Sequence, residues 1–163
     1  MSISLGTGVS AIDPSSQTVS FVGSTTNDSA VAGNIGEIVT ATLATGSAVV
    51  LTTNTTANVT SISLTAGDWD VTGTVVFKFG ATTSYTNLVG GTSTTSATLG
   101  AQGTAFDFET PAAVPTAGAD TTWTVPVVRI SIAATTTVFL VAQATFTVST
   151  LNAYGQIRAR RVR

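Results

Sequence analysis

Residues 58–79 carry the pattern that most limits the folds open to this chain. They are predicted to form two strands joined by an Ala-Gly-Asp turn at residues 66–68. The second strand alternates between an apolar and a polar face, with Val76 as the one apolar exception on the polar side. The apolar face holds Trp69, Val71, Val75, Phe77 and Phe79, and the polar face holds Asp70, Thr72, Thr74 and Lys78. A period of two is typical of a sheet with one face against a core.

Short segments with strand character recur from residue 36 onward, separated by turn residues, and no window has a helical stripe. We expect strands at residues 37–43, 48–52, 59–64, 69–79, 84–89, 96–99, 105–109, 122–132, 136–148 and 154–162. Gly90-Gly91 is predicted to be a turn, opening a long loop over residues 90–120. Pro126 inside a strand predicts an edge or a bulge. Many short strands without helices indicate an all-β sandwich or jelly roll.

The first 34 residues differ from the rest, because Gly, Ser, Asn and Asp are frequent and Pro14 interrupts them. Residues 17–22 are their one strand-like piece. We therefore predict an extended N-terminal arm over residues 1–35, ordered against a neighbouring molecule, followed by a β-sandwich domain over residues 36–163. The alternative is a flexible N-terminus.

The composition excludes several kinds of chemistry. The chain has no Cys and no His, which rules out disulfides, thiolate metal sites and nucleophilic catalysis by Ser/His/Asp or Cys/His sets. Lys78, the one lysine, lies on a polar strand face and is expected to be solvated or at an interface rather than catalytic. We therefore expect no enzymatic activity and no cofactor.

Charge is scarce, at 9% of residues against about 25% in an average protein. The 34 threonines take its place as the polar residue suited to the outer face of a strand. A net charge of −2 gives no long-range field to attract nucleic acid or acidic lipid. No apolar run approaches the ~20 residues of a membrane helix, and residues 1–6 lack the features of a signal peptide.

Phe139 and Val141 are apolar residues on the second face of the 136–148 strand, whose first face is already predicted to be core. A strand that is apolar on both faces is usually covered on both. We therefore expect an oligomer interface near Val76, Phe139 and Val141. The alternative is that the loop at residues 111–120 folds over them.

Two pairs of carboxylates stand at alternate positions, Asp68 with Asp70 and Asp107 with Glu109. Each pair shares a strand face and could in principle hold Ca²⁺. No Asp-x-Asp-x-Asp-Gly pattern accompanies them, so we predict no metal site and leave the Ca²⁺ question open.

The C-terminus concentrates positive charge at Arg158, Arg160, Arg161 and Arg163. The first interpretation is that these arginines contact carboxylates of a partner or of another subunit. The second is that they are solvated charges that discourage edge-to-edge pairing. Nucleic-acid binding is disfavoured, because no aromatic residues are interleaved with the arginines.

Two segments of the chain have a recognisable pattern: Val-Thr-Ser-Ile-Ser-Leu-Thr-Ala-Gly-Asp-Trp-Asp-Val-Thr-Gly at residues 59–73 and Tyr-Gly-Gln-Ile-Arg-Ala-Arg-Arg-Val-Arg at residues 154–163. They resemble small virion proteins of tailed bacteriophages, which are similar to the trimeric jelly rolls of the tumour-necrosis-factor/C1q type. The resemblance covers about residues 36–163. It implies a homotrimer on the virion surface without enzymatic activity. The lack of a collagen-like or coiled-coil stalk departs from C1q proteins and long fibres.

Three roles are considered, two for a virion protein and one outside that class. A capsid decoration, or cement, protein would lay residues 1–35 across the major capsid protein or another virion protein, and the small size and lack of a stalk favour it. A tail fibre or receptor-binding tip would contact host glycan through the 90–120 loop. A carbohydrate-binding module or adhesin is the third, and it would normally carry a secretion signal.

Overall fold

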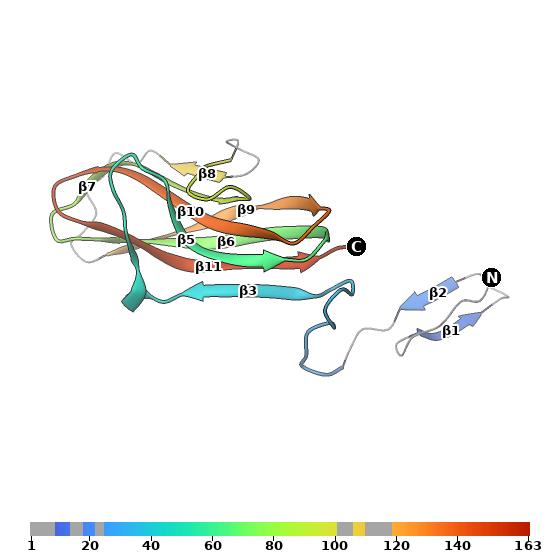
Figure 1. Ribbon diagram of the computed structural model, residues 1–163. Coiled ribbons are helices and arrows are strands. Elements are labelled where there is room, and N and C mark those ends of the chain that lie inside the picture. The colour runs from blue at the N-terminus through green and yellow to red at the C-terminus, as the bar shows by residue number, and fades with distance from the viewer. Residues whose placement is uncertain (1–8, 14–17, 22–24, 101–105, 110–118) are drawn as a thin grey trace.

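The computed structural model describes residues 9–13, 18–21, 25–100, 106–109 and 119–163. Within them the chain is nearly all β, with one 3-10 turn, η1 (Thr45–Ser47) (Figure 1). The main strands are β3 (Ile38–Leu43), β5 (Ala57–Leu64), β6 (Gly67–Phe79), β7 (Ser84–Ser93), β8 (Phe106–Glu109), β9 (Asp120–Ile132), β10 (Thr136–Thr147) and β11 (Leu151–Arg161). A two-residue strand, β4 (Val49–Val50), pairs with the start of β11.

These eight main strands form two antiparallel sheets. One has the order β3-β11-β6-β9 and the other the order β5-β10-β7-β8. Numbered one to eight along the chain, the sheets become 1-8-3-6 and 2-7-4-5. This is the strand order of a jelly roll, and it confirms the predicted fold class.

Two further strands, β1 (Val9–Asp13) and β2 (Thr18–Phe21), pair antiparallel in a separate two-stranded sheet. Sequence analysis predicted β2 but not β1. The other residues of the segment before position 25 lie outside the described part. The division into an arm and a sandwich domain therefore stays a prediction.

The core lies between the two sheets, and β6 supplies its largest side chains. Trp69, Val71, Val75 and Phe77 are fully buried, as the alternation of the sequence predicts. Leu140, Ala142 and Ala144 face them from β10 of the other sheet, and Ile157 and Ala159 lie beside them on the neighbouring strand β11. Each large apolar side chain buried in this way contributes about 1.5–3 kcal/mol relative to exposure.

The prediction of a turn at Gly90-Gly91 is wrong, because both glycines are buried inside β7, which runs on to Ser93. A Cβ on Gly90 would stand 3.2 Å from a methyl group of Val75 in the facing sheet. The glycine therefore serves close packing across the core rather than chain reversal. The predicted strand at residues 96–99 is also absent, and those residues form a loop.

Pro126 lies where its geometry predicts. Strand β9 pairs with β6 on one side only, so it is an edge strand of its sheet. The register shifts between Val71 opposite Val128 and Gly73 opposite Val125, which makes a bulge at Pro126 and Val127. Both parts of the prediction are confirmed.

Strand β11 lies between β3 and β6 and is an interior strand. The interpretation of its arginines as edge charges is therefore wrong, because no edge is exposed there for them to protect. Among the described residues, no helix is long and apolar enough to cross a membrane.

Candidate functional site

One end of the sandwich brings together the start of β3, the start of β6 and the end of β11 (Figure 1). Most of the charged residues of the described chain gather there. The alternation of β11 places Ile157, Ala159 and Arg161 on its inner face and Arg158 and Arg160 on its outer face. The C-terminal arginines are thus divided between two surfaces.

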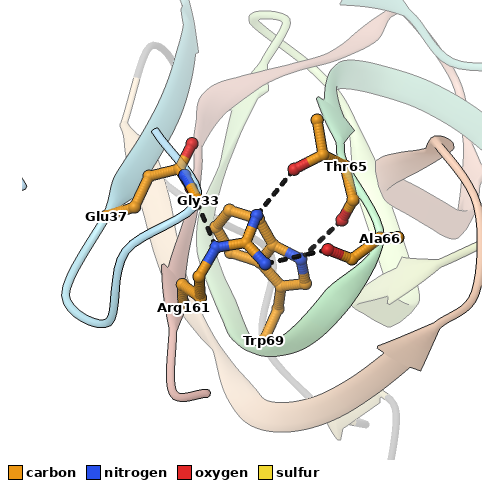
Figure 2. A network of polar contacts seen from close by, with 6 residues as sticks. All are labelled: Gly33, Glu37, Thr65, Ala66, Trp69 and Arg161. Carbon is orange, nitrogen blue, oxygen red and sulfur yellow. Dashed lines mark hydrogen bonds and ion pairs between the residues drawn. The ribbon is translucent and has the colours of Figure 1, made fainter. Parts of the chain in front are cut away.

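Arg161 closes the end of the core and is 4% exposed. Its guanidinium carbon lies 4.2 Å from the centroid of the Trp69 ring, which places a cation over an aromatic face (Figure 2). Nη1 donates to the Ala66 carbonyl at 2.9 Å, and Nη2 donates to the Thr65 hydroxyl at 2.6 Å. The network therefore fixes the turn that joins β5 and β6.

Glu37 is the ionic partner of this buried arginine. Arg161 Nε donates to Glu37 Oε2 at 2.9 Å, and the Gly33 amide donates to the same oxygen at 2.8 Å (Figure 2). Backbone bonds from Gly36 N to Arg161 O and from Arg161 N to Glu37 O complete the attachment. Residues 33–37, which we call the arm root, are thus tied to Arg161 of the sandwich by three hydrogen bonds.

A second ionic cluster centres on Asp68, which is 3% exposed. Arg129 Nε and Nη2 donate to its two oxygens at 2.8 and 2.6 Å, and Arg163 Nε lies 2.7 Å from Oδ2. These arginines lower the pKa of Asp68, the hydrogen bond from Arg129 being the largest cause. The pKa of Glu37 is lowered as well, first by the Gly33 amide and then by Arg161.

Acid should therefore loosen this end of the sandwich. A carboxylate whose pKa is lower in the folded state stabilises the fold when the pH is above its ordinary pKa, which is 4.5 for Glu37 and 3.8 for Asp68. That stabilisation is lost as the pH falls through the folded-state pKa. We expect the urea midpoint to be flat above pH 5 and to fall steadily below pH 4.5. A Glu37→Gln variant should start lower at pH 7 and show a shallower fall. Equal slopes for the two proteins would contradict the assignment of Glu37.

The outer face of the same end carries a shallow cleft of about 190 Å³. It is lined by Asp70, Thr72, Val127, Arg158 and Arg160. The register places Arg160 opposite Asp70, and Asp70 in turn opposite Arg129. Arg158 and Arg160 are exposed, and among the described residues neither has an ion pair.

The three predicted interface residues do not meet on one surface. Val76 is half-buried on the outer face of the β3-β11-β6-β9 sheet, and Phe139 is half-buried on the outer face of the other sheet. Val141 is fully buried within the chain. Asn58, its partner in the register, binds Ser96 and the Ala97 amide, so the loop after β7 crosses that face. Contacts of these residues with another subunit stay a prediction.

The structure places the side chains of one of the two predicted carboxylate pairs but not those of the other. Asp68 is held by arginines, while Asp70 lines the outer cleft. The side chains of Asp107 and Glu109 lie outside the described part of the chain. Among the described residues, no group of three or more potential metal-ligating side chains occurs.

A wider groove of about 420 Å³ lies farther along the same outer face, with Tyr154 and Gln156 among its lining residues. The Tyr154 hydroxyl donates to Asp120 Oδ2 at 2.6 Å, which raises the pKa of Tyr154. Gln156 Nε2 donates to the Thr42 hydroxyl at 3.0 Å. Its main polar side chains therefore already bind one another.

Sequence analysis missed the roles of Glu37, Trp69 and Arg129 at this end. The sequence does contain a signal for Arg161. It stands at alternate positions with Ile157 and Ala159 on one strand, so its side chain must point to the same inner face. No comparable signal marked Glu37 as its partner, since 124 residues separate the two.

Comparisons with known proteins give distant similarity to solved structures. No protein-family model matches the chain, and no curated protein matches it. A structure titled "Structure of infectious bursal disease virus Gx strain" is similar with a TM-score of 0.44 and 16% sequence identity, over 97% of this chain. The chain spans 38% of the length of that viral chain.

Proposed function

We propose that this chain is a non-enzymatic structural protein of a phage virion. In this role it binds the capsid surface as a homotrimer and acts as a decoration, or cement, protein. The arm at residues 1–35 contacts the major capsid protein or another virion protein, and the sandwich stands on top.

The observation that carries the proposal is the arm root. Its backbone is fixed to the sandwich through Arg161 and Glu37, yet Ile35 is 70% exposed and the neighbouring Val31 is 73% exposed. Ile38, the first residue of β3, is 36% exposed at the same end. Apolar side chains held outward on an anchored segment favour a protein partner that covers them.

The wider groove favours this role over a carbohydrate-binding module that holds sugar on this face of the sheet. Sugar recognition needs free donors and acceptors beside an aromatic face. Here the Tyr154 hydroxyl already donates to Asp120, and the Gln156 amide already donates to the Thr42 hydroxyl. This supports a partner bound through the arm at residues 1–35 rather than a sugar bound on the sheet.

Removing residues 1–32 tests the proposal, because Gly33 and its bond to Glu37 remain. We expect a folded protein whose melting temperature lies within about 2 °C of the full chain, since none of the core residues that the structure describes is lost. The full chain should bind to virus particles that lack it, and the truncated chain should not. Binding is measured by co-sedimentation with the particles.

Light scattering of both proteins gives the oligomeric state, and a mass three times 16.4 kDa is expected for the full chain. A monomer would remove the trimer from the proposal. Equal sedimentation of the full and truncated chains would contradict the role of the arm.

A further inference from the structure

The arginines of this chain fall into two groups. Arg161 is buried with Glu37, and Arg129 and Arg163 hold Asp68, so these three satisfy carboxylates of the same chain. Arg158 and Arg160 have no such partner among the described residues, and both are exposed. Only 9% of the residues in this protein are charged, so two neighbouring guanidiniums without a partner mark this surface as a candidate site for an anionic group.

The geometry of the cleft limits what it can bind. Arg158 and Arg160 are alternate residues of an interior strand, so their Cα atoms lie about 6.5–7 Å apart on one face. Carboxylates on alternate residues of any extended segment have the same spacing. Backbone pairing with such a segment is excluded, because β11 already has a neighbour on each side. Recognition would therefore run from side chain to side chain.

Val127 adds an apolar contact to this basic pair. It belongs to the bulge of β9, is 63% exposed and lines the same cleft. The Thr72 hydroxyl is used within the chain, since it donates to the Val125 carbonyl at 2.8 Å. Among the described residues, the cleft thus offers two guanidiniums, one aliphatic side chain and the Asp70 carboxylate, which lies opposite Arg160 in the register.

We propose that this cleft binds an extended acidic segment of the protein partner, with carboxylates on alternate residues facing Arg158 and Arg160. An apolar side chain of the same segment packs on Val127. The inference rests on the proposed function, because it assigns the chemistry of the surface that the partner presents. It also places the contact at the end of the sandwich from which the arm departs.

A nucleic-acid phosphate backbone fits the cleft less well. Asp70 lines it between the register positions of Arg160 and Arg129, and a polyanion would have to approach that carboxylate. The described lining has no aromatic side chain on which a base could stack. A discrete carboxylate can approach each guanidinium in the bidentate manner and avoid Asp70.

Calorimetric titration of the full-length chain at low salt tests this directly. The probe is a capped octapeptide of alternating glutamate and threonine, and its glutamine counterpart is the uncharged control. We expect the glutamate peptide to bind and the glutamine peptide not to bind. Arg158→Gln or Arg160→Gln should each weaken binding roughly fivefold, in the range of a well-formed exposed ion pair.

Lys78→Gln is the matched control, because it removes one exposed positive charge from the other end of the same sheet face. It should leave peptide binding unchanged. Failure of the glutamate peptide to bind, equal effects of Lys78→Gln and Arg158→Gln, or tighter binding of an oligothymidylate would each overturn the proposal. The last result would identify a nucleic-acid surface instead.

The same variants separate this inference from the proposed function. If the full chain binds particles and the arginine variants bind equally well, the cleft proposal fails alone. If the glutamate peptide binds as expected but the full chain does not bind particles, the virion role fails and the acidic-ligand site stands.

Discussion

Replacing Arg161 by methionine should lower the free energy of unfolding by about 3 kcal/mol, the usual cost of removing one partner of a buried ion pair. Methionine keeps most of the volume over Trp69, so the loss is electrostatic and hydrogen-bonding rather than a cavity. Glu37, whose side chain is 12% exposed, would lose its cation, and the Ala66 carbonyl would lose a donor. Urea denaturation at pH 7 measures the change, and the melting temperature should fall by about 6–12 °C.

Arg160→Met is the matched control, because Arg160 is adjacent to Arg161 on the same strand but is exposed on the opposite face. It should change stability by no more than about 0.5 kcal/mol. Arg161→Lys should fall between the two, since an ammonium keeps the charge but lacks the planar fork that reaches Glu37, Ala66 and Thr65 together. Equal destabilisation by Arg160→Met and Arg161→Met would show that the buried network does not stabilise the fold.

The sheets could be predicted from sequence because burial in a sandwich repeats every two residues. Strand β6 is the clearest case, since Trp69, Val71, Val75 and Phe77 are all buried as the pattern requires. The strand order could not be obtained in this way. Alternation tells which face of a strand is inward but not which strand lies beside it, and β11 pairs with β3 across more than a hundred residues.

Local propensity gives the wrong prediction where tertiary packing decides the conformation. Gly90-Gly91 has the composition of a turn, yet the pair stays extended because β10 and β8 bond to it from both sides. The missing side chain of Gly90 makes room there for Val75 of the opposite sheet. The sequence contains no local mark of that contact.

The candidate site shows the same division between local and distant information. Because side chains alternate between the two faces of β11, Arg161 lies on the opposite face from Arg158 and Arg160. The alternation therefore predicts which arginine is buried. Treating the four C-terminal arginines as one set of partner contacts concealed this difference. The carboxylates that hold Arg161 and Arg163, by contrast, come from Glu37 and Asp68, which only the folded topology brings near.

The largest effect expected from a single methyl group is at Gly155, in the middle of β11. Its φ of +151° is rarely adopted by residues with a side chain, and a Cβ there would collide with the Thr74 carbonyl oxygen of β6. Neither strand can retreat, since β11 is also bonded to β3 and β6 is also bonded to β9. Gly155→Ala should therefore cost about 4 kcal/mol, combining backbone strain of about 1–3 kcal/mol with overpacking of similar size.

Gly46→Ala provides the comparison, because that glycine lies in η1 and a Cβ there meets no atom within 4 Å. It should leave the urea midpoint within the range of ordinary surface substitutions, about 0.5 kcal/mol. If Gly155→Ala accumulates only in inclusion bodies, refolding both variants from urea side by side still gives the comparison. A Gly155→Ala protein within 1 kcal/mol of the Gly46→Ala protein would mean that β11 and β6 can separate locally, and the tight pairing at the centre of this sheet would then be wrong.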